Sequence, residues 1–256
     1  MSVLHALLFD VDGTLAETER DGHREAFNQA FAEDGLPWHW GERRYGELLQ
    51  VSGGRERIRH FAAAEDPEWL RRAGADELIG RIHRHKNHHY QELLRGGGVT
   101  LRRGLRGLLQ QALAADLQLA VVTTTSRDNL DALLRATLDA DCRAAFRVRI
   151  TGEDVARKKP DAECYRLALA ALGLRPEQAL AVEDSRNGLL AARGAGVQTL
   201  IVRSFYFEHE DFGGALAVVD DFEALRLPDL LHRFECGASV SLPTQSAPLP
   251  DPALVQ

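Results

Sequence analysis

Cysteine is scarce in this sequence, because Cys142, Cys164 and Cys236 are the only three in 256 residues. Three thiols so far apart are too few for a disulfide framework or a zinc site. Long apolar runs are also missing, since none approaches the roughly 20 residues that a membrane helix needs. The N-terminus leads directly into a short apolar run, without a signal peptide or transit segment. We therefore expect a cytoplasmic protein in a reducing compartment.

Positive charge is in the minority: 31 Lys and Arg residues face 38 Asp and Glu residues, which leaves a net charge of -7. This balance argues against a nucleic-acid partner and against an anionic membrane surface. The remaining composition, 45% hydrophobic and 27% charged residues, is that of an ordinary globular protein. The length fits one domain with an insertion, or two small domains.

The first apolar run, Val3–Phe9, ends in two aspartates, Asp10 and Asp12, and a glycine turn. Such a run is typical of a buried strand in a parallel sheet. Side chains two positions apart in an extended chain point the same way, so both carboxylates should reach the crevice beyond the strand's carboxyl end. Two converging carboxylates require a cation, and hard oxygen ligands suit Mg²⁺. An aspartate can also attack phosphorus as a nucleophile. The alternative is a turn in which both aspartates only cap backbone amides.

Helical and strand patterns alternate regularly from Leu105 onward. This alternation predicts βαβ units, a parallel sheet and right-handed crossovers. The fold class we expect is α/β, with a doubly wound, mostly parallel sheet. The expected helix–strand pairs are Leu105–Ala115 with Leu117–Val122, Asp128–Thr137 with Arg147–Thr151, Ala162–Leu172 with Ala179–Val182, and Gly188–Ala195 with Val197–Val202.

Residues 17–94 contain no strand pattern, and their apolar residues recur at helical spacing. We therefore predict a helical cap over residues 16–95, inserted into an α/β core formed by residues 1–15 and 96–236. Gly96-Gly97-Gly98 provides a natural hinge at the end of the insert. The last segment, residues 237–256, contains four of the nine prolines and is predicted to be a disordered tail.

Polar residues suited to phosphate chemistry follow each predicted core strand. Thr123-Thr124-Thr125-Ser126 could cradle a phosphate, although such a cluster is also a common helix N-cap. Lys158-Lys159 could neutralise a phosphate or a carboxylate, although a lysine pair is usually solvated. Glu183-Asp184-Ser185 provides a second acidic pair for Mg²⁺. The order and placement of these signals are more specific than any one of them.

These residues resemble the four motifs of the haloacid dehalogenase-like hydrolases. The matching segments are Asp10–Leu15, Thr123, Lys159-Pro160 and Glu183–Gly188, and the helical insert is similar to that of the β-phosphoglucomutase-like branch. Details such as Glu17-Thr18-Glu19 with His23, and Tyr45 before Ser52–Arg57, resemble the CbbY-type sugar-bisphosphate phosphatases, which act on xylulose 1,5-bisphosphate. The Glu19–His23 segment is one residue longer here than in some relatives, which leaves the placement of His23 open.

The resemblance implies a role for each core residue. Asp10 would be the nucleophile and Asp12 the general acid and then base, with Thr123 and Lys159 completing the catalytic set. Mg²⁺ would be held by Asp10, the backbone carbonyl of Asp12, and Asp184, with Glu183 acting through water. Lys159 is preferred because it directly precedes Pro160, and Lys158 is the fallback.

The cap must provide specificity, because the core recognises only a phosphoryl group. Arg55 and Lys86 are candidates to bind a second phosphate. Tyr45 is as easily a core residue, and His85 with His89 could form a metal pair but fits a solvated face better. The full set of candidate substrate-binding residues is Glu17, His23, Tyr45, Gly53, Gly54, Arg55, Lys86, Thr124, Thr125, Arg127 and Asn187.

The sequence therefore predicts a Mg²⁺-dependent phosphatase that hydrolyses a sugar bisphosphate, most simply xylulose 1,5-bisphosphate. A phosphosugar mutase shares the same core residues and is the main alternative. A binding protein on the same fold is the third reading, although it would not need the complete catalytic set. We expect a monomer whose partner is a small phosphosugar, with no nucleic-acid or membrane partner.

Overall fold

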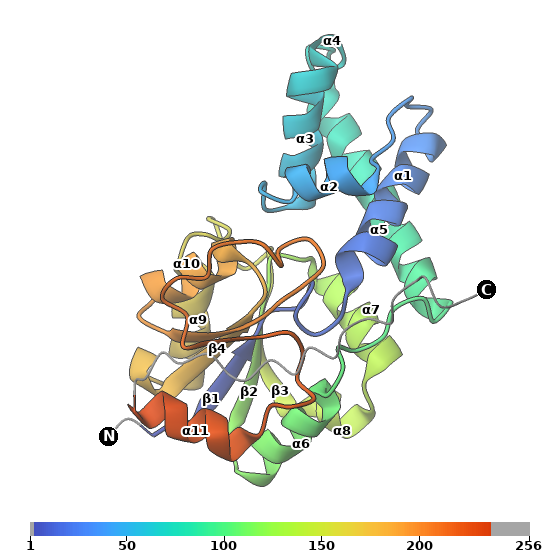
Figure 1. Ribbon diagram of the computed structural model, residues 1–256. Helices are drawn as coiled ribbons and strands as arrows, with labels where there is room; N and C mark the ends of the chain where they lie inside the picture. The colour runs from blue at the N-terminus through green and yellow to red at the C-terminus, as the bar shows by residue number, and fades with distance from the viewer. Residues whose placement is uncertain (1–2, 237–256) are drawn as a thin grey trace, which may run out of the picture.

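Six parallel strands form the sheet at the centre of the molecule, in the order β3-β2-β1-β4-β5-β6 (Figure 1). The structure, a computed structural model, describes residues 3–236. The strands are β1 (Ala6–Phe9), β2 (Gln118–Val122), β3 (Phe146–Ile150), β4 (Ala179–Glu183), β5 (Gln198–Val202) and β6 (Ala217–Val219). The doubly wound α/β fold expected from the sequence is confirmed, with one strand, β6, that the sequence did not predict.

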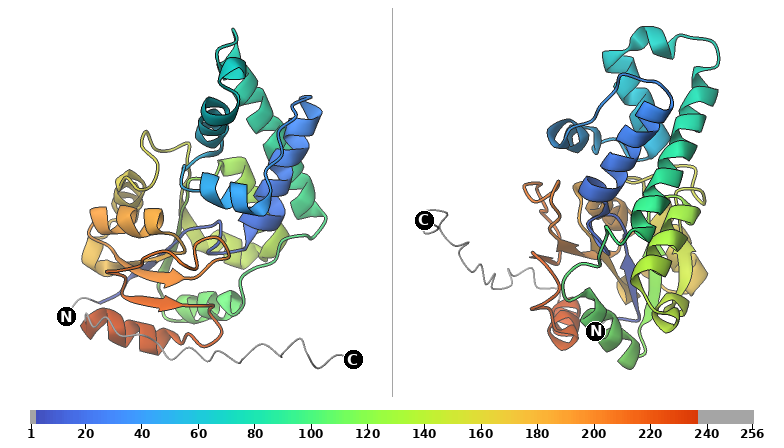
Figure 2. Two further views of the ribbon diagram at one scale, coloured as in Figure 1. Left: turned by 45° about the horizontal axis from the view of Figure 1, so that its top comes forward. Right: turned by 90° about the vertical axis from the view of Figure 1, so that its right-hand side faces the viewer.

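Successive side chains of each strand pack on opposite faces of the sheet, as strand geometry requires. Leu7 and Phe9 of β1 pack on the face covered by α6, α7, α8 and α11. Ala6 and Leu8 pack on the other face, against α9 and α10. The result is a three-layer core, and because β1 is central its carboxyl end lies at the middle of one edge of the sheet (Figures 1 and 2).

Helices lie between successive strands from β1 to β5, which allows these strands to be parallel. A loop joins β5 to β6, which is also parallel. The helices of the core are α6 (Leu105–Ala114), α7 (Arg127–Thr137), α8 (Ala140–Ala145), α9 (Glu163–Leu172), α10 (Arg186–Gly194) and α11 (Leu227–Cys236), with a short 3₁₀ turn at Pro176–Gln178. No helix in the described part of the chain is long and apolar enough to cross a membrane.

A second group of helices lies beyond the carboxyl ends of the strands, and we call it the cap (Figure 1). It consists of a π-helical turn (Glu19–His23), α1 (Arg24–Glu33), α2 (Glu42–Leu48), α3 (Gly54–Glu65), α4 (Pro67–Leu70) and α5 (Ala75–Arg95). Phe27, Phe31, Trp38 and Trp40 form much of its own aromatic core. The domain boundaries given above stay predictions.

Helix α5 contributes to two hydrophobic cores. Ile79 and Ile82, in its first half, pack in the aromatic core of the cap. Tyr90 and Leu94, in its second half, pack in the main core with Leu7 and Phe9. The cap is therefore attached to the sheet by packed side chains and not only by its two connecting segments.

The Glu19–His23 segment forms a π-helical turn. The amide of Arg24 donates to the carbonyl of Glu19, an i→i+5 bond that encloses one residue more than an α-helical turn. Such a turn has room for one additional residue, and His23 at its end reaches the site described below.

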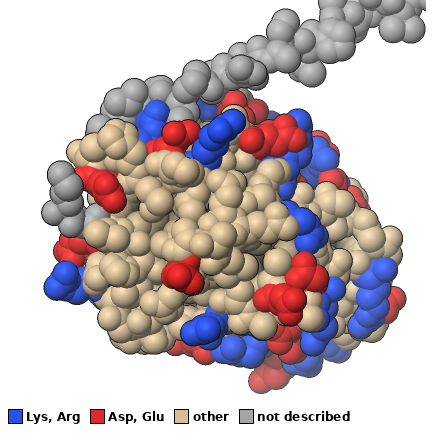
Figure 3. Space-filling view, turned by 90° about the horizontal axis from the view of Figure 1, so that it is seen from below, with Lys and Arg blue, Asp and Glu red and all other residues tan. Residues whose placement is uncertain are grey.

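On the face of the molecule away from the cap, uncharged residues occupy most of the centre, and acidic and basic side chains lie interspersed, mainly around the edge (Figure 3). Within the described residues of this face, neither charge forms a continuous patch. The predicted tail, residues 237–256, lies outside the described residues.

Candidate active site

Asp10 directly follows β1 and lies beside the end of β4. The register pairs Phe9 with Val182, and the amide of Asp10 donates to the Val182 carbonyl at 2.9 Å. Parallel pairing therefore places Asp10 next to Glu183 and Asp184, as the motif order predicted. Asp10, Glu183 and Asp184 are all buried.

Lys159 connects the two acidic groups. Its Nζ donates to Asp10 Oδ1 at 2.7 Å, to Glu183 Oε1 at 2.6 Å and to the Val122 carbonyl at 2.8 Å. The Tyr165 hydroxyl also donates to Glu183 Oε1, at 2.5 Å. Burial lowers the pKa of Lys159, but the two carboxylates outweigh burial and raise that pKa above its usual value. The ammonium is therefore a permanent positive charge in this centre.

The three carboxylates form a group that fits a divalent cation. One oxygen from each of Asp10, Glu183 and Asp184 lies within 4.8 Å of the others. Within residues 3–236, Glu183 Oε2 and Asp184 Oδ2 are buried without a hydrogen-bond partner, which is costly unless something else binds them. Burial raises the pKa of Asp10 to about 8, with Glu183 and Asp12 adding to the rise against Lys159. Hard, crowded oxygen donors of this kind suit Mg²⁺.

Two glycines leave space for the carboxylates of Asp184 and Glu183. A Cβ on Gly13 would lie 1.9 Å from Asp184 Oδ2, and a Cβ on Gly188 would lie 1.9 Å from Glu183 Oε2. Gly13 also has a φ of +84°, which favours glycine. The glycines of the first and fourth motifs are therefore needed for the packing of the acidic group.

Asp12 lies on the cap side of the centre, at one end of a hydrogen-bonded chain. Its Oδ1 accepts from Thr18 Oγ1 at 2.5 Å and lies 3.0 Å from His23 Nε2, while Lys86 Nζ lies 2.8 Å from His23 Nδ1. Burial raises the pKa of Asp12, but His23 and Thr18 outweigh it and bring that pKa to about 2. Burial lowers the pKa of Lys86 to about 8.

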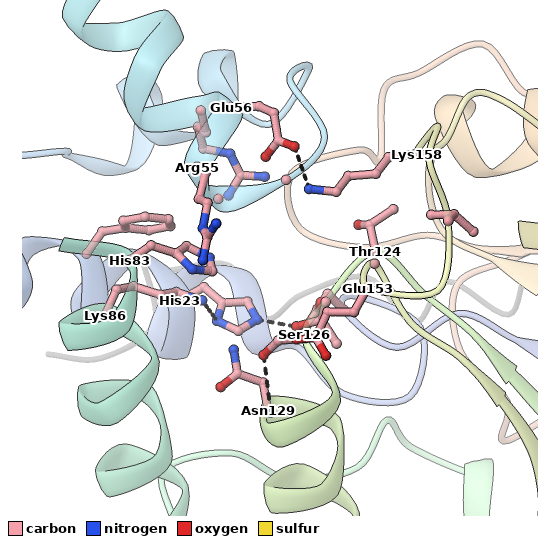
Figure 4. A pocket seen from close by; sticks show the side chains of 18 of the residues that line it. His23, Arg55, Glu56, His83, Lys86, Thr124, Ser126, Asn129, Glu153 and Lys158 are labelled. Carbon is pink, nitrogen blue, oxygen red and sulfur yellow. Dashed lines mark hydrogen bonds and ion pairs between the residues drawn. The ribbon is translucent and has the colours of Figure 1, made fainter. Parts of the chain in front are cut away.

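A cavity of about 380 Å³ extends from Asp12 between the cap and the core (Figure 4). A smaller cavity of about 60 Å³ contains Asp10, Lys159 and Asp184. Asp12 and Thr124 line both, so the two are adjacent. The predicted residues that line the larger cavity are Asp12, His23, Gly53, Gly54, Arg55, Lys86, Thr124 and Thr125, and Asn187 lines the smaller one.

Five predicted residues line neither cavity, and one of them, Glu183, is fully buried in the acidic centre. Glu17 forms an ion pair with Arg102, Arg127 pairs with Asp154, and the hydroxyl of Thr123 accepts from the Thr125 amide at 3.2 Å. Tyr45 is fully buried, and its hydroxyl donates to Glu19 Oε2 at 2.5 Å and accepts from Arg57 at 3.0 Å. Tyr45 therefore lies behind the cavity wall, where it contacts Glu19 and Arg57.

Several cavity residues were not identified from the sequence. Glu19, and not Glu17, reaches both cavities, because the turn before the π helix directs Glu17 toward Arg102. Arg57 belongs to the Ser52–Arg57 segment but had no predicted role, and Lys158 was predicted only as the fallback for Lys159. His83, Asn129 and Glu153 also line the larger cavity, as does Ser126 of the predicted Thr123–Ser126 cluster. Burial together with Lys86, Arg55 and Lys158 lowers the pKa of His83 to about 3.

His85 and His89 contact the end of α1. His85 Nδ1 lies 3.0 Å from Asp34, and His89 Nε2 lies 2.7 Å from Glu33. Among the described residues, the group able to hold a metal is the one formed by Asp10, Glu183 and Asp184. These histidines therefore link two cap helices.

The chain matches known proteins along most of its length. Residues 4–196 match the family described as haloacid dehalogenase-like hydrolase. Protein CbbY of Cupriavidus necator (plasmid) is 46% identical over 90% of this chain and 93% of its own length. Protein CbbY of Cereibacter sphaeroides is 45% identical over 87% of this chain and 94% of its own.

Solved structures agree with these sequence relatives. The crystal structure of CbbY from Rhodobacter sphaeroides in complex with phosphate is 45% identical, has a TM-score of 0.80 and covers 87% of this chain and 96% of its own. A mutant of that protein has been crystallised with xylulose-(1,5)bisphosphate, with the same score and coverage. The protein is thus a phosphatase, a phosphoric monoester hydrolase. With its family match, its CbbY relatives and its strand-end acidic centre, the chain belongs to the haloacid dehalogenase-like hydrolases.

Proposed function

We propose that this protein is a Mg²⁺-dependent phosphatase of sugar bisphosphates, with xylulose 1,5-bisphosphate as the first candidate substrate. The observation that carries the proposal is the single buried centre in which Lys159 bridges Asp10 and Glu183, next to a cavity large enough for a pentose. The xylulose bisphosphate bound to a 45% identical relative supports the choice of sugar.

Asp10 would attack phosphorus and form an aspartyl-phosphate. One of its oxygens is occupied by Lys159, so the other carboxylate oxygen is available for attack. The pKa of about 8 means that the buried group needs positive charge nearby to remain ionised. Mg²⁺, when bound by Asp10, Asp184 and the Asp12 carbonyl with Glu183 through water, would supply that charge and shield the phosphate.

Asp12 would donate a proton to the leaving sugar oxygen and later accept one from the attacking water. Its present contacts with Thr18 and His23 stabilise the carboxylate, as its pKa of about 2 shows. This arrangement suits the base of the second step. Donation in the first step requires the carboxyl group to leave His23 and turn toward the substrate, where its pKa rises.

The larger cavity would hold the sugar and its second phosphate. Gly53 is the N-cap of α3 and, with Gly54, lines the cavity, so the start of this helix would favour an anion bound there. Arg55 extends from the first turn of the same helix and lines the cavity. A second phosphate placed here would bind the cap and thereby favour closure over the core.

We expect a preference of at least about a hundredfold in kcat/KM for a pentulose bisphosphate over the better of its two monophosphates. Each charge-assisted contact to phosphate is worth roughly 1.5–3 kcal/mol, or about one to two orders of magnitude. Arg55→Ala should reduce this preference mainly by slowing the bisphosphate.

The measurement is phosphate release from a panel of sugar monophosphates and bisphosphates by wild type and Arg55→Ala. Equal efficiency on both substrate types in the wild type would contradict the bisphosphatase. Recovery of an isomeric phosphosugar in place of inorganic phosphate would identify the mutase instead.

Lys159→Ala should lower kcat by about 10²-fold or more, the usual loss of one preorganised charge-stabilising donor. It also leaves Asp10 and Glu183 facing each other without a cation, so its thermal stability should fall. The comparison is with Lys158→Ala, whose side chain lies outside the buried centre. If Lys158→Ala lowered kcat on a monophosphate strongly and Lys159→Ala lowered it only mildly, the roles of the two lysines would be reversed.

A further inference from the structure

Lys158 and Lys159 are adjacent in the chain but serve different cavities. Lys159 points into the buried centre, where 5% of its side chain is exposed. Lys158 lines the larger cavity and extends toward the cap, where its Nζ lies 2.6 Å from Glu56 Oε1 (Figure 4). Both lysines lie in a turn between β3 and α9, in which the amide of Asp161 donates to the Lys158 carbonyl at 3.1 Å. One loop therefore presents an ammonium to each of the two cavities.

The Lys158–Glu56 pair is fitted closely against the start of α3. A Cβ on Gly53 would lie 2.5 Å from Lys158 Nζ and 2.3 Å from Glu56 Oε2. Glu56 occupies the first turn of α3, next to Arg55. The ion pair therefore lies at the start of α3, where Gly53, Gly54 and Arg55 line the cavity.

Arg55 and Lys158, the cations near the start of α3, have few anionic partners. Within residues 3–236, Arg55 has no ion pair within 4.0 Å, and His83, which faces it, is neutral because burial and the neighbouring cations hold its pKa near 3. The ammonium of Lys158 is paired with a single carboxylate that is about half exposed. Exchanging that carboxylate for a phosphate dianion would give Lys158 and Arg55 a common anionic partner with two negative charges.

We propose that Lys158 determines specificity for bisphosphates, by exchanging Glu56 for the second phosphoryl group of the substrate. This inference rests on the proposed function and adds to it the residue on the core side of the second phosphate site. Lys159 and Lys158 then bind the two phosphates of one molecule, and a monophosphate satisfies only one of them. Because Lys158 belongs to the core and Arg55 to the cap, the second phosphate also joins the two.

The test measures kcat/KM for xylulose 1,5-bisphosphate and for both xylulose monophosphates with four proteins: wild type, Lys158→Met, Glu56→Gln and Arg157→Met. Arg157 is the matched control, because it precedes Lys158, is exposed, and pairs with Asp161 outside the cavity. Melting temperatures confirm that each variant is folded.

Lys158→Met should lower kcat/KM for the bisphosphate by about 10- to 100-fold, the effect of one charge-assisted contact. The loss on the monophosphates should be at least about tenfold smaller, since those substrates gain little from the second site. Glu56→Gln should lower the bisphosphate KM by up to about fivefold, because an exposed ion pair that competes with the substrate is removed. Arg157→Met should behave as wild type with every substrate.

Other results would overturn the inference in distinguishable ways. If wild type prefers the bisphosphate and Lys158→Met keeps that preference, the proposed function stands and Lys158 is only a surface ion pair. If Lys158→Met slows all substrates equally, it acts in catalysis and not in specificity. If Glu56→Gln raises the bisphosphate KM as Lys158→Met does, the pair closes the cap and no exchange occurs. If wild type has no preference, the proposed function itself fails.

Discussion

Asp10→Asn should reduce turnover by about four orders of magnitude or more, the scale of losing a covalent nucleophile. Asparagine has nearly the same shape but cannot attack phosphorus as a carboxylate does. Asp10 follows the central strand and already has one oxygen on Lys159, so the substitution changes charge far more than packing. Initial rates on the best sugar bisphosphate would measure the effect, and near-normal phosphate release would rule out the covalent mechanism.

The same variant should remain as stable as wild type in metal-free buffer. Burial raises the pKa of Asp10 to about 8, so between about pH 4 and pH 8 the native state holds a proton that the unfolded chain releases. The free energy of unfolding contributed by this group therefore falls as pH rises through that window. A neutral asparagine avoids this loss, and its melting temperature at pH 7.5 should be no lower than that of wild type. A large drop would mean that Asp10 is a structural residue.

Removal of Mg²⁺ should abolish activity almost completely, by at least about 10³-fold, because the dianionic substrate must approach a centre with three buried carboxylates. Dialysis against a chelator followed by assay, with Mg²⁺ added back to restore the rate, measures the effect. Asp184→Asn is the matched control, since the activity that this variant loses should not be restored at ordinary Mg²⁺ concentrations. Full activity in a preparation shown to be metal-free would contradict the metal site.

Mg²⁺ should also stabilise the folded protein, because it binds only the assembled centre. The cation competes with protons for carboxylates whose pKa values burial has raised. The apparent affinity should therefore strengthen from pH 6 to pH 8. The rise in melting temperature on adding Mg²⁺ should be smaller at the lower pH, and Asp184→Asn should show little rise at either.

The fold could be predicted largely from the sequence, because alternating apolar runs and helical patterns leave few ways to arrange a parallel sheet. Strand β6 was missed since Ala217–Val219 is three residues long, too short to show a period. The π turn was missed for another reason: a helical pattern does not reveal that one turn contains an extra residue. The sequence did indicate that the segment was longer.

The candidate site could likewise be predicted only in part. Asp10, Lys159, Glu183 and Asp184 could be located together because each lies at or after the carboxyl end of a strand, and parallel strands bring those ends to one edge. Cap residues lie on helices, and tertiary packing determines how each helix is rotated about its axis. The spacing of residues in the sequence does not reveal this rotation. Glu17 and Glu19 show the difference, since they are two positions apart but lie in separate environments.

Helix α5 has a consequence for how the protein unfolds and how its cap can be exchanged. Its 21 residues span about 30 Å, and its two halves belong to separate hydrophobic cores. If one core unfolded, α5 would lose half of its packing, and the other core needs this helix to be folded. The cap and the sheet should therefore unfold together as one cooperative unit. For the same reason, grafting a cap from a relative between two loop positions would leave Tyr90 and Leu94 without their partners unless the lower half of α5 remained with the sheet.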